Sequence, residues 1–597
     1  METRVKQNQR GLWIALALVL LLRLPFLNLA IQGDEHQYLT EAAHAQVDPL
    51  HPKNTTYVFL GDVVDQRGQP HPPLNAWTLA ALIASVGSVR EVPFHAAYIL
   101  YSAIAVIAMW SLAKRFSPNP LWATLLFVAV PAFVVNGASL ESDLPFLAMW
   151  MAAVALFCAG RLAWSAVAMA LAALAAYQAV FLTPILAVYL LLYRRRDFAA
   201  WLVILTPPIV LAAWQLFERA TTGAAPAAVA AGYFSSYHLQ ALTAKLRNAV
   251  ALSGHACFLV FPALLPGAVV LAWRKRREAD TRFLLAWIGL FFAGALAIFF
   301  AGSARYLLPM AAPVALLASR LSTRWLAAGV AANLAIGLGL GMANAEHWDA
   351  YRQFAHEQRH LMDAQPTHRV WVDGLWGLRH YLEEEGALPL RKGQIVKPGD
   401  YVVSSELSSS VELNAPVAPV ATREIRPSIP FRIIGLETAS GYSSVGRGLW
   451  PFGLSTGVID RVRAVKVVER HPTVSWLPMD APEAKDQIVA GIYSQEGKIR
   501  WMSKTASVVL KSPDGATPLR VDFTIHPNSK ARRVRLLLDG REAAAKTYAG
   551  PGDYSLASDP VRPAGPAAVV TIELDATFNA PGDARDLGVV LSGVGFH

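Results

Sequence analysis

The sequence predicts a polytopic α-helical membrane protein whose helices are followed by two folded units outside the membrane, a small α/β unit and a β-sandwich. Three observations lead to this prediction. The chain is 54% hydrophobic and 16% charged, whereas soluble proteins carry about 25% charged residues. Apolar runs near the roughly 20 residues that span a bilayer recur from Gly11 to Met342. After residue 344 the composition becomes that of a soluble protein.

The apolar runs divide into about eleven predicted transmembrane helices. They cover residues 11–32, 94–113, 119–138, 143–160, 163–176, 178–193, 198–217, 251–272, 282–301, 304–319 and 322–343. A further apolar stretch, 74–88, is short enough to be read either as a span or as a helix lying on the membrane. Counting it as a span reverses the orientation of everything that follows it.

The basic residues decide between these readings, because cytoplasmic loops are enriched in Lys and Arg. If 74–88 does not span and the N-terminus is cytoplasmic, every basic cluster lies inside. The clusters are Arg4/Lys6/Arg10, Lys114/Arg115, Arg161, Arg194–Arg196, Arg274–Arg277 with Arg282, and Arg320/Arg324. We therefore predict an external loop, 33–93, with an interfacial helix at 74–88, and an extracytoplasmic C-terminal region.

The chain after residue 344 is predicted to form two units. The segment "RVWVDGLWGLRHYLEEEG" (369–386) indicates a strand followed by a helix, and "DYVVSSEL" (400–407) indicates another strand. After about residue 485, short alternating runs between Gly, Pro and Asp turns indicate a β-sandwich. The predicted domains are a transmembrane domain (1–344), an α/β domain (345–480) and a β-sandwich domain (481–597).

Composition also argues against several classes of protein. Cys158 and Cys257 are the only cysteines and both lie in apolar runs, so no disulfide framework is indicated. The net charge of +10 does not indicate nucleic-acid binding, because the basic residues lie in short loops between spans. No internal repeat is visible, and the acidic residues lie at the external rim, which argues against a transporter. The first apolar run has no small-residue cleavage site after it, which indicates an anchor and not a cleaved signal peptide.

Asp34 and Glu35, in "GDEHQY", directly follow the first predicted span on its external side. A charge beside lipid is costly, so its presence is a hint of function. Asp34 is suited to act as a general base toward an acceptor hydroxyl or amine. Glu35 would point elsewhere on a helix, since sequence neighbours do not share a face, and would position or bind substrate. A helix that must end in water would explain the pair equally well.

Three more motifs are predicted on the same side. Asp143, in "ESDLPF", stands at the head of a span, where an ordinary N-cap would also explain it. In "QPHPPLNAW" (69–77), Pro72-Pro73 forces an extended kink that fixes where His71 points, and a cationic or hydrogen-bonding His suits a phosphate. Arg305, in "GSARYLLP", lies among apolar residues and should meet a carboxylate or a phosphate, unless it snorkels to the surface.

Together these residues predict an external, lipid-facing site that contains a base and anion binders. Additional candidates for its substrate pocket are Tyr38, Tyr177, Gln178 and Tyr306. A substrate with a phosphate head and a very apolar tail would suit such a site. No set of metal ligands is predicted.

These motifs carry a resemblance to a known family. The acidic pair after the first span, "HPPL" (71–74), "SDLPF" (142–146) and "RYLLPMAAP" (305–313) resemble the dolichyl-phosphate-mannose-protein mannosyltransferase family of C-type (GT-C) membrane glycosyltransferases. The bacterial lipid A aminoarabinose transferase belongs to the same broad group. The resemblance covers about residues 1–345, with a weaker echo at 369–386.

The resemblance implies transfer of a sugar from a polyprenyl-phosphate carrier to a glycan, lipid or protein acceptor, with inversion at the anomeric carbon. Asp34 matches the family's catalytic base, Glu35 its partner, and Asp143 the acidic residue of the second external loop. His71 and Arg305 match positions suited to the carrier phosphate. The implied location is a bacterial cytoplasmic (inner) membrane, with the catalytic face outside the cytoplasm.

The chain departs from the family pattern at two places. Many relatives carry a Lys near "LAAYQAVFL" (174–182), where this chain has Tyr177 and Gln178. The aminoarabinose transferases have an acidic residue, associated with a metal, at the position that is Pro70 here. We therefore expect that no cofactor is required, since His71 and Arg305 can compensate the phosphate charge. Modification of lipid A is not supported.

Two other functions share much of this pattern. An oligosaccharide ligase or an oligosaccharyltransferase-like enzyme would have the same topology and a different donor headgroup. A non-catalytic protein that binds or transports polyprenyl lipids would keep the carrier site without transferring a sugar. The presence of both Asp34 and Asp143 argues against the non-catalytic alternative.

Overall fold

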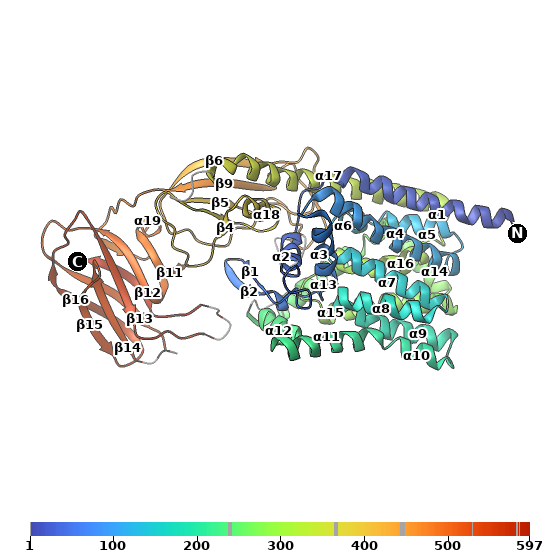
Figure 1. Ribbon diagram of the computed structural model, residues 1–597, viewed down its shortest axis with the longest axis horizontal. Helices are drawn as coiled ribbons and strands as arrows, with labels where there is room; N and C mark the ends of the chain where they lie inside the picture. Colours follow the sequence, from blue (N-terminus) through green and yellow to red (C-terminus); the bar gives the residue numbers. More distant parts are fainter. Residues whose placement is uncertain are drawn as a thin grey trace.

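The protein is elongated, with a helical domain at one end, a β domain at the other and an α/β domain between them (Figure 1). The computed structural model describes residues 2–236, 241–362, 368–441, 448–527, 529, 531–580, 583 and 585–597. The N-terminus projects from the outer end of the helical domain, and the C-terminus lies in the β domain (Figure 1).

Seventeen α-helices of the described residues form the helical domain and its continuation toward the α/β domain. They are α1 (Glu2–Arg23), α2 (Glu35–His44), α3 (Leu74–Val86), α4 (Glu91–Phe116), α5 (Pro120–Val128), α6 (Pro131–Asn136), α7 (Asp143–Cys158), α8 (Leu162–Ala175), α9 (Leu182–Tyr193), α10 (Phe198–Val203), α11 (Thr206–Thr222), α12 (Pro226–Ser236), α13 (Leu242–Ala256), α14 (Leu265–Arg274), α15 (Ala279–Ile298), α16 (Leu308–Ala318) and α17 (Thr323–Glu357). Two 3-10 turns matter for the site, η3 (Tyr177–Phe181) and η5 (Arg305–Leu307).

Four helical segments in the described part of the chain are long and apolar enough to cross a membrane, which makes this a helical membrane protein. They cover 91–116, 198–222, 279–298 and 323–361. The first predicted span corresponds to the 22-residue α1 and most of the others to shorter helices, so the number of about eleven stays a prediction. Three predicted spans are interrupted, one of them between α10 and α11. Pro131 begins α6 after α5 has ended, and the chain around Pro262 separates α13 from α14, because proline cannot continue a helix hydrogen-bond ladder.

The buried side chain of Arg23 ties the end of α1 to two other helices. Its guanidinium donates hydrogen bonds to Ser102 Oγ (3.2 Å) and to the carbonyls of Phe133 and Val134 (both 2.9 Å). Burial of a cation is costly unless its donors are satisfied, and here the three bonds provide partners. Arg23 thereby connects the first helix to α6, which leads directly into the loop containing Glu141.

The external loop predicted at 33–93 is a folded unit. It contains α2, the hairpin β1 (Thr56–Phe59) and β2 (Asp62–Asp65), and α3. Helix α3 matches the apolar stretch 74–88 and packs against α2. It ends at Gly87, whose positive φ terminates the helix, and its length is well below that of a bilayer span.

The predicted domain boundary at residue 344 falls inside α17, which continues without a break from the helical domain to Glu357. Its last turns place Trp348, Tyr351 and Phe354 in the core of the α/β domain. The sheet of that domain has the order β4 (Leu388–Pro389), β3 (Val370–Asp373), β5 (Tyr401–Ser405), β9 (Asp460–Val467), β6 (Val417–Ile425). Helix α18 (Trp376–Glu384) follows β3, as the sequence predicts, and packs between α17 and α2. A short ribbon, β7 (Phe431–Arg432) with β8 (Gly453–Leu454), reaches back to α17.

The C-terminal domain is all-antiparallel, but its strands form one connected sheet and not the two separate sheets of the predicted sandwich. The path is β15 (Arg541–Tyr548), β14 (Arg532–Leu538), β17 (Ala567–Leu574), β12 (Ile499–Lys511), β18 (Val590–Phe596), β13 (Thr517–Ile525), β16 (Gly552–Val561), with β10 (Trp476–Pro478) beside β18 and β11 (Ile488–Glu496) beside β12. The connection arises because β18 pairs with both β12 and β13. The sheet ends β15 and β16 lie against each other, so the sheet curls around one apolar core.

Candidate active site

Arg305 is the centre of a charged cluster at the end of the helical domain that faces the α/β domain. Its Nη2 lies 3.5 Å from Asp34 Oδ2 and its Nε lies 3.4 Å from Asp143 Oδ2, while Nη1 pairs closely with Glu141. These residues come from the start of α2, the loop before α7, the start of α7 and η5. Two segments far apart in sequence, at residue 34 and at residues 141–143, therefore present three carboxylates to the guanidinium of a third.

Exposure distinguishes the three carboxylates. The side chain of Asp34 is 42% exposed, whereas those of Glu141 and Asp143 are 5% and 8% exposed and that of Arg305 is 10% exposed. A buried ion pair needs close geometry to offset desolvation, and the Glu141 pair with Arg305 is the tightest here. Asp34 makes the longest contact and has the greatest access to solvent, so it is the carboxylate most able to reach a substrate.

The backbone around Asp34 is built to hold this arrangement. The N–H of Asp34 donates to Glu141 Oε1 at 3.0 Å. Gly33 has a φ of +45°, and a Cβ there would lie 2.5 Å from the same Glu141 oxygen. Only glycine combines this backbone conformation with so close an approach. Glu141 therefore pairs with Arg305 and also fixes the backbone position of Asp34.

Glu35 does not line the cavity beside Asp34. It is fully buried behind Asp34 and accepts hydrogen bonds from the N–H groups of Gln32 (3.0 Å) and Leu140 (2.8 Å). Burial raises the pKa of Glu35 to about 7, and those two N–H groups act in the opposite direction. Of the two roles predicted for Glu35, the structure favours positioning, because its carboxylate joins the loop before α2 to the loop before α7.

A cavity of about 450 Å³ opens beside Asp34 and Arg305. Its polar lining includes Asp34, Gln37, Tyr38, Asp65, Gln69, His71, Glu141, Arg305, Tyr306, Ser408 and Ser409, and its apolar lining includes Phe59, Leu60, Tyr233, Phe234, Phe300, Leu375, Trp376, Leu407 and Ile434. The helical domain and its external loop form most of the wall. The α/β domain supplies the remainder, so the site is shared between two domains.

His71 lines this cavity, but its environment does not suit the predicted cationic role. Burial, together with the nearby Lys53 and Arg305 cations, lowers the pKa of His71 to about 3. His71 Nδ1 lies 3.4 Å from the carbonyl of Ala175, and donation in that direction leaves Nε2 of the neutral ring as an acceptor. The imidazole then suits a hydroxyl donor, and compensation of a phosphate charge is left to Arg305.

Lys53, which was not among the predicted site residues, stabilises the loop that carries His71 through hydrogen bonds. Its buried ammonium donates to the carbonyl of Gln69 (3.0 Å), to Gln69 Oε1 (2.8 Å) and to the carbonyl of His71. Glu41 lies 3.5 Å away and balances the charge. A single lysine thus replaces several backbone donors that this Pro-rich loop lacks.

Replacing His71 by Gln is expected to make stability less dependent on pH. The pKa of His71 is about 3 in the folded protein, and its ordinary value is 6.5. As the pH falls, His71 therefore binds a proton in the unfolded chain at a higher pH than in the folded protein. Its contribution to stability is therefore complete above pH 6.5 and is lost as pH falls toward 3. Between pH 8 and pH 5 the wild type should lose about 2 kcal/mol more than His71→Gln. Unfolding of detergent-solubilised protein at the two pH values measures this difference, and parallel losses would contradict the neutral assignment.

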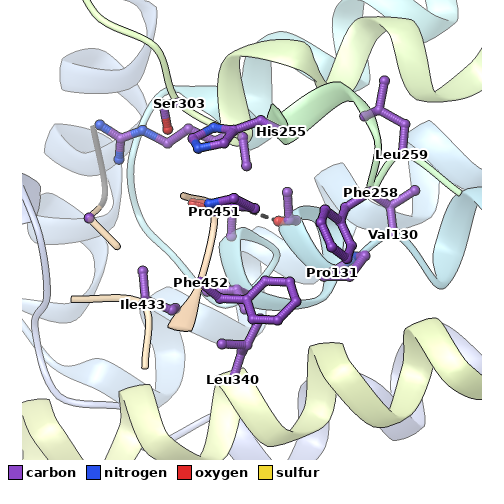
Figure 2. Close-up of a pocket in the computed structure, with 16 residues that line it drawn as sticks. Val130, Pro131, His255, Phe258, Leu259, Ser303, Leu340, Ile433, Pro451 and Phe452 are labelled. Carbon is purple, nitrogen blue, oxygen red and sulfur yellow. Dashed lines mark hydrogen bonds between the residues drawn. The ribbon is translucent and has the colours of Figure 1, made fainter. Parts of the chain in front are cut away.

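A second, apolar groove adjoins the cavity at Arg305, which lines both. The groove has a volume of about 50 Å³. In Figure 2, Pro451 and Phe452 of the α/β domain face His255, Phe258 and Pro131 across it, with Leu340 of α17 below. The ring of Phe452 packs edge-on against Phe258 at 4.9 Å between centroids. The chain just before β8 therefore reaches the helical domain beside the site, at residues 451 and 452.

Helix α18 of the α/β domain is docked directly on the loop that carries Asp34. The N–H of Ile31 donates to Tyr381 Oη at 2.8 Å. His36 Nε2 lies 3.0 Å from Glu383 Oε2, and His36 Nδ1 lies 3.3 Å from the Nδ1 of His380. These contacts join one turn of α18 to the residues on both sides of Asp34, so the position of Asp34 depends on the α/β domain.

Gly377→Ala is expected to disturb this docking. A Cβ at Gly377 would lie 2.1 Å from the Ile31 carbonyl oxygen, and a backbone atom cannot move aside cheaply. We expect a loss of stability of roughly 1–3 kcal/mol and a reduced activity, since Asp34 follows Ile31 by three residues. Thermal unfolding and turnover measure the two effects. Gly289→Ala in α15 is the matched control, because nothing lies within 4 Å of a Cβ there; equal effects of the two changes would contradict the docking argument.

The structure brings most of the predicted site residues together. Those that converge on the cavity or on Arg305 are Asp34, Tyr38, His71, Asp143, Arg305 and Tyr306. Tyr177 and Gln178 do not line the cavity. Tyr177 Oη instead accepts a hydrogen bond from Gln215 (2.9 Å), and its ring packs against Trp214 of α11. The 3-10 turn η3 directs these side chains between helices.

Sequence reasoning missed two residues that the site uses. Glu141 stands two positions before Asp143 in the quoted "ESDLPF" motif, and the motif could have suggested it. Trp376 lies in the "RVWVDGLWGLRHYLEEEG" echo, but nothing local in the sequence places it in the cavity. Within the described residues, no group of three or more His, Cys, Asp and Glu side chains is arranged to hold a metal ion; the three carboxylates face Arg305 instead.

Comparison with known proteins gives a structural similarity only. No protein-family model matches the chain, and no curated protein matches it. Among solved structures, ArnT from Cupriavidus metallidurans bound to undecaprenyl phosphate aligns with 14% identity and a TM-score of 0.46, over 68% of this chain and 95% of that one. Its apo structure aligns with 12% identity and a TM-score of 0.43, over 66% and 92%.

The arabinofuranosyltransferase AftD from mycobacteria aligns over 98% of this chain with 13% identity and a TM-score of 0.37. This chain covers 61% of the AftD chain. The structural neighbours are thus ArnT and an arabinofuranosyltransferase, each at 12–14% identity. TM-scores below 0.5 are too low to assign a site or a substrate to this chain.

Proposed function

We propose that this protein is an inverting glycosyltransferase that moves a sugar from a polyprenyl-phosphate carrier to an acceptor outside the cytoplasm. The observation that carries the proposal is the position of Arg305, which lines both a polar cavity with carboxylates and an apolar groove. A carrier lipid has the same two parts, an anionic head and a hydrocarbon tail. With the phosphate at Arg305, the first carbons of the tail would enter the groove and the sugar would lie in the cavity.

Asp34 is the proposed base. The acceptor hydroxyl oxygen attacks the anomeric carbon and forms the new glycosidic bond as the bond from that carbon to the phosphate oxygen breaks. The acceptor proton passes to Asp34, and the electron pair of the broken bond stays on the leaving polyprenyl phosphate. The developing negative charge is stabilised by the Arg305 guanidinium in a partly buried site, where such an interaction is stronger than in water.

Binding of the carrier phosphate to Arg305 would release Asp34 from its ion pair and so free it to act as the base. Of the contacts to the three carboxylates, that of Asp34 involves the most exposed side chain, while Glu141 holds the opposite guanidinium nitrogen closely. An arriving phosphate would replace Asp34 at Nη2, since charge-assisted contacts from a guanidinium suit phosphate oxygens. Asp34 would then turn toward the acceptor while Glu141 and Asp143 keep Arg305 in place.

The test is a turnover assay with the purified full-length protein and a panel of polyprenyl-phosphate sugars. Release of free polyprenyl phosphate, followed by mass spectrometry, is the expected result with at least one donor. Tight binding of the carrier without release, whichever acceptors are added, would overturn the transferase and favour a carrier-binding protein. Release only from carriers bearing an oligosaccharide would favour a ligase of larger glycans.

A further inference from the structure

The wall that the α/β domain contributes to the cavity consists of Leu375, Trp376, Leu407, Ser408 and Ser409, with Ile434 beside them. Trp376 is only partly buried, and its ring packs edge-on against Trp348 at 5.8 Å between centroids. A large aromatic ring is thus packed against a second indole and lines the same cavity as Asp34.

The backbone at Trp376 is strained. Its φ is +61°, a conformation that side chains other than glycine rarely adopt. Three non-glycine residues in the described part of the chain have positive φ, and two of them, Leu60 and Trp376, line this cavity. Strain of this kind persists where the surroundings enforce it, and it concentrates at ligand sites.

The surroundings that hold Trp376 are identifiable. The N–H of Leu375 donates to Ser408 Oγ at 3.1 Å, and Ser408 Oγ donates to Ser405 Oγ at 3.0 Å. Ser405 Oγ in turn donates to the buried Asp460 at 2.7 Å. This chain of bonds fixes the turn before α18 and also places the Ser408 and Ser409 segment beside the indole.

We propose that Trp376, with Ser408 and Ser409, binds a sugar ring of the acceptor, which makes the acceptor a carbohydrate. A sugar presents a C–H face that packs on an aromatic ring and hydroxyls that need polar partners, and this wall offers both. The proposal rests on the proposed glycosyltransferase function and extends it to the class of acceptor.

The placement favours the acceptor over the donor sugar. The donor is tied to a phosphate at Arg305, on the side that continues into the apolar groove. In an inverting displacement the nucleophile approaches from the side opposite to the leaving phosphate. We assign the incoming sugar to the wall around Trp376 because its residues line the cavity and not the groove.

Three variants of the full-length protein test the proposal. Trp376→Gly removes the ring and leaves a residue that adopts a positive φ without strain. Trp376→Phe keeps an aromatic face. Trp164→Ala removes an exposed ring from α8, far from the cavity lining, and is the matched control. Monodispersity and thermal unfolding confirm that each variant is folded.

Two readouts separate the acceptor from the donor. The first is binding of methyl glycosides of common hexoses and pentoses, followed by saturation-transfer NMR up to about 10 mM. The second is release of polyprenyl phosphate without added acceptor, where water takes the place of the acceptor. We expect Trp376→Gly to weaken glycoside binding roughly tenfold or more, Trp376→Phe to retain most of it, and both to lower acceptor-independent release by a smaller factor than glycoside binding.

Glycoside binding that is unchanged in Trp376→Gly, or absent from the wild type at all concentrations, would overturn the proposal. An equal fall in acceptor-independent release would assign Trp376 to the donor sugar and would also overturn it. Wild-type protein that binds glycosides through Trp376 but releases no polyprenyl phosphate would support the sugar site while the proposed transferase fails.

Discussion

Asp34→Asn is expected to lower sugar transfer by about 10²–10⁴-fold while carrier binding stays within a few-fold of the wild type. Asparagine keeps the size and hydrogen-bonding shape of the side chain but does not accept a proton as a base. The Asp34 backbone N–H would still bond to Glu141, so the local fold is retained. The Asp34 side chain is 42% exposed and lies 3.5 Å from Arg305. Such an exposed ion pair contributes too little stability for its loss to unfold the site.

The measurement is release of polyprenyl phosphate under saturating donor, with carrier binding measured in parallel. Asp62→Asn is the matched control, because Asp62 lies on the same external loop, pairs with Lys392 at 2.6 Å and does not line the cavity. Transfer that survives in Asp34→Asn would remove Asp34 from the role of base and leave Glu141 as the next candidate. The transferase itself would stand.

Arg305→Met is expected to destabilise the protein by about 3–5 kcal/mol and to abolish carrier binding. Methionine fills a similar volume but leaves Glu141 and Asp143, 5% and 8% exposed, without a cation. Two buried carboxylates in the described cluster would then have to be neutralised or hydrated. Thermal unfolding in detergent and titration with polyprenyl phosphate measure the two consequences.

A double variant separates folding from function at this position. Arg305→Met combined with Glu141→Gln removes the most tightly paired carboxylate charge and should recover part of the lost stability without recovering carrier binding. Arg352→Met is a comparison outside the site, since Arg352 pairs with Glu91 at 3.1 Å and is 25% exposed, and its effect should be smaller. An Arg305→Met protein that is stable and still binds polyprenyl phosphate would refute the anion role.

The site shows where local patterns suffice and where they do not. Asp34, Asp143 and Arg305 were all predictable because a charge at the external end of an apolar run is expensive and therefore informative. Their mutual distances were not, since Asp34 and Glu141 are 107 positions apart in sequence. For the same reason the sequence left open whether His71 is cationic or a neutral hydrogen-bonding group, because its pKa depends on burial and on Lys53 and Arg305, which only the folded chain brings near.

By itself the sequence determined the helical membrane character, the short helix within the loop 33–93, the β-rich C-terminal region and a set of candidate site residues. These features follow from composition, from periodicity and from the cost of charge near lipid, all of which are local. The tertiary structure alone decided that α17 crosses the predicted domain boundary and that the β strands join one sheet. It alone decided that α18 holds the Asp34 loop and that Trp376 enters the cavity. The physical reason is that packing between distant segments sets which side chains meet and which are desolvated, and no short stretch of sequence contains that information.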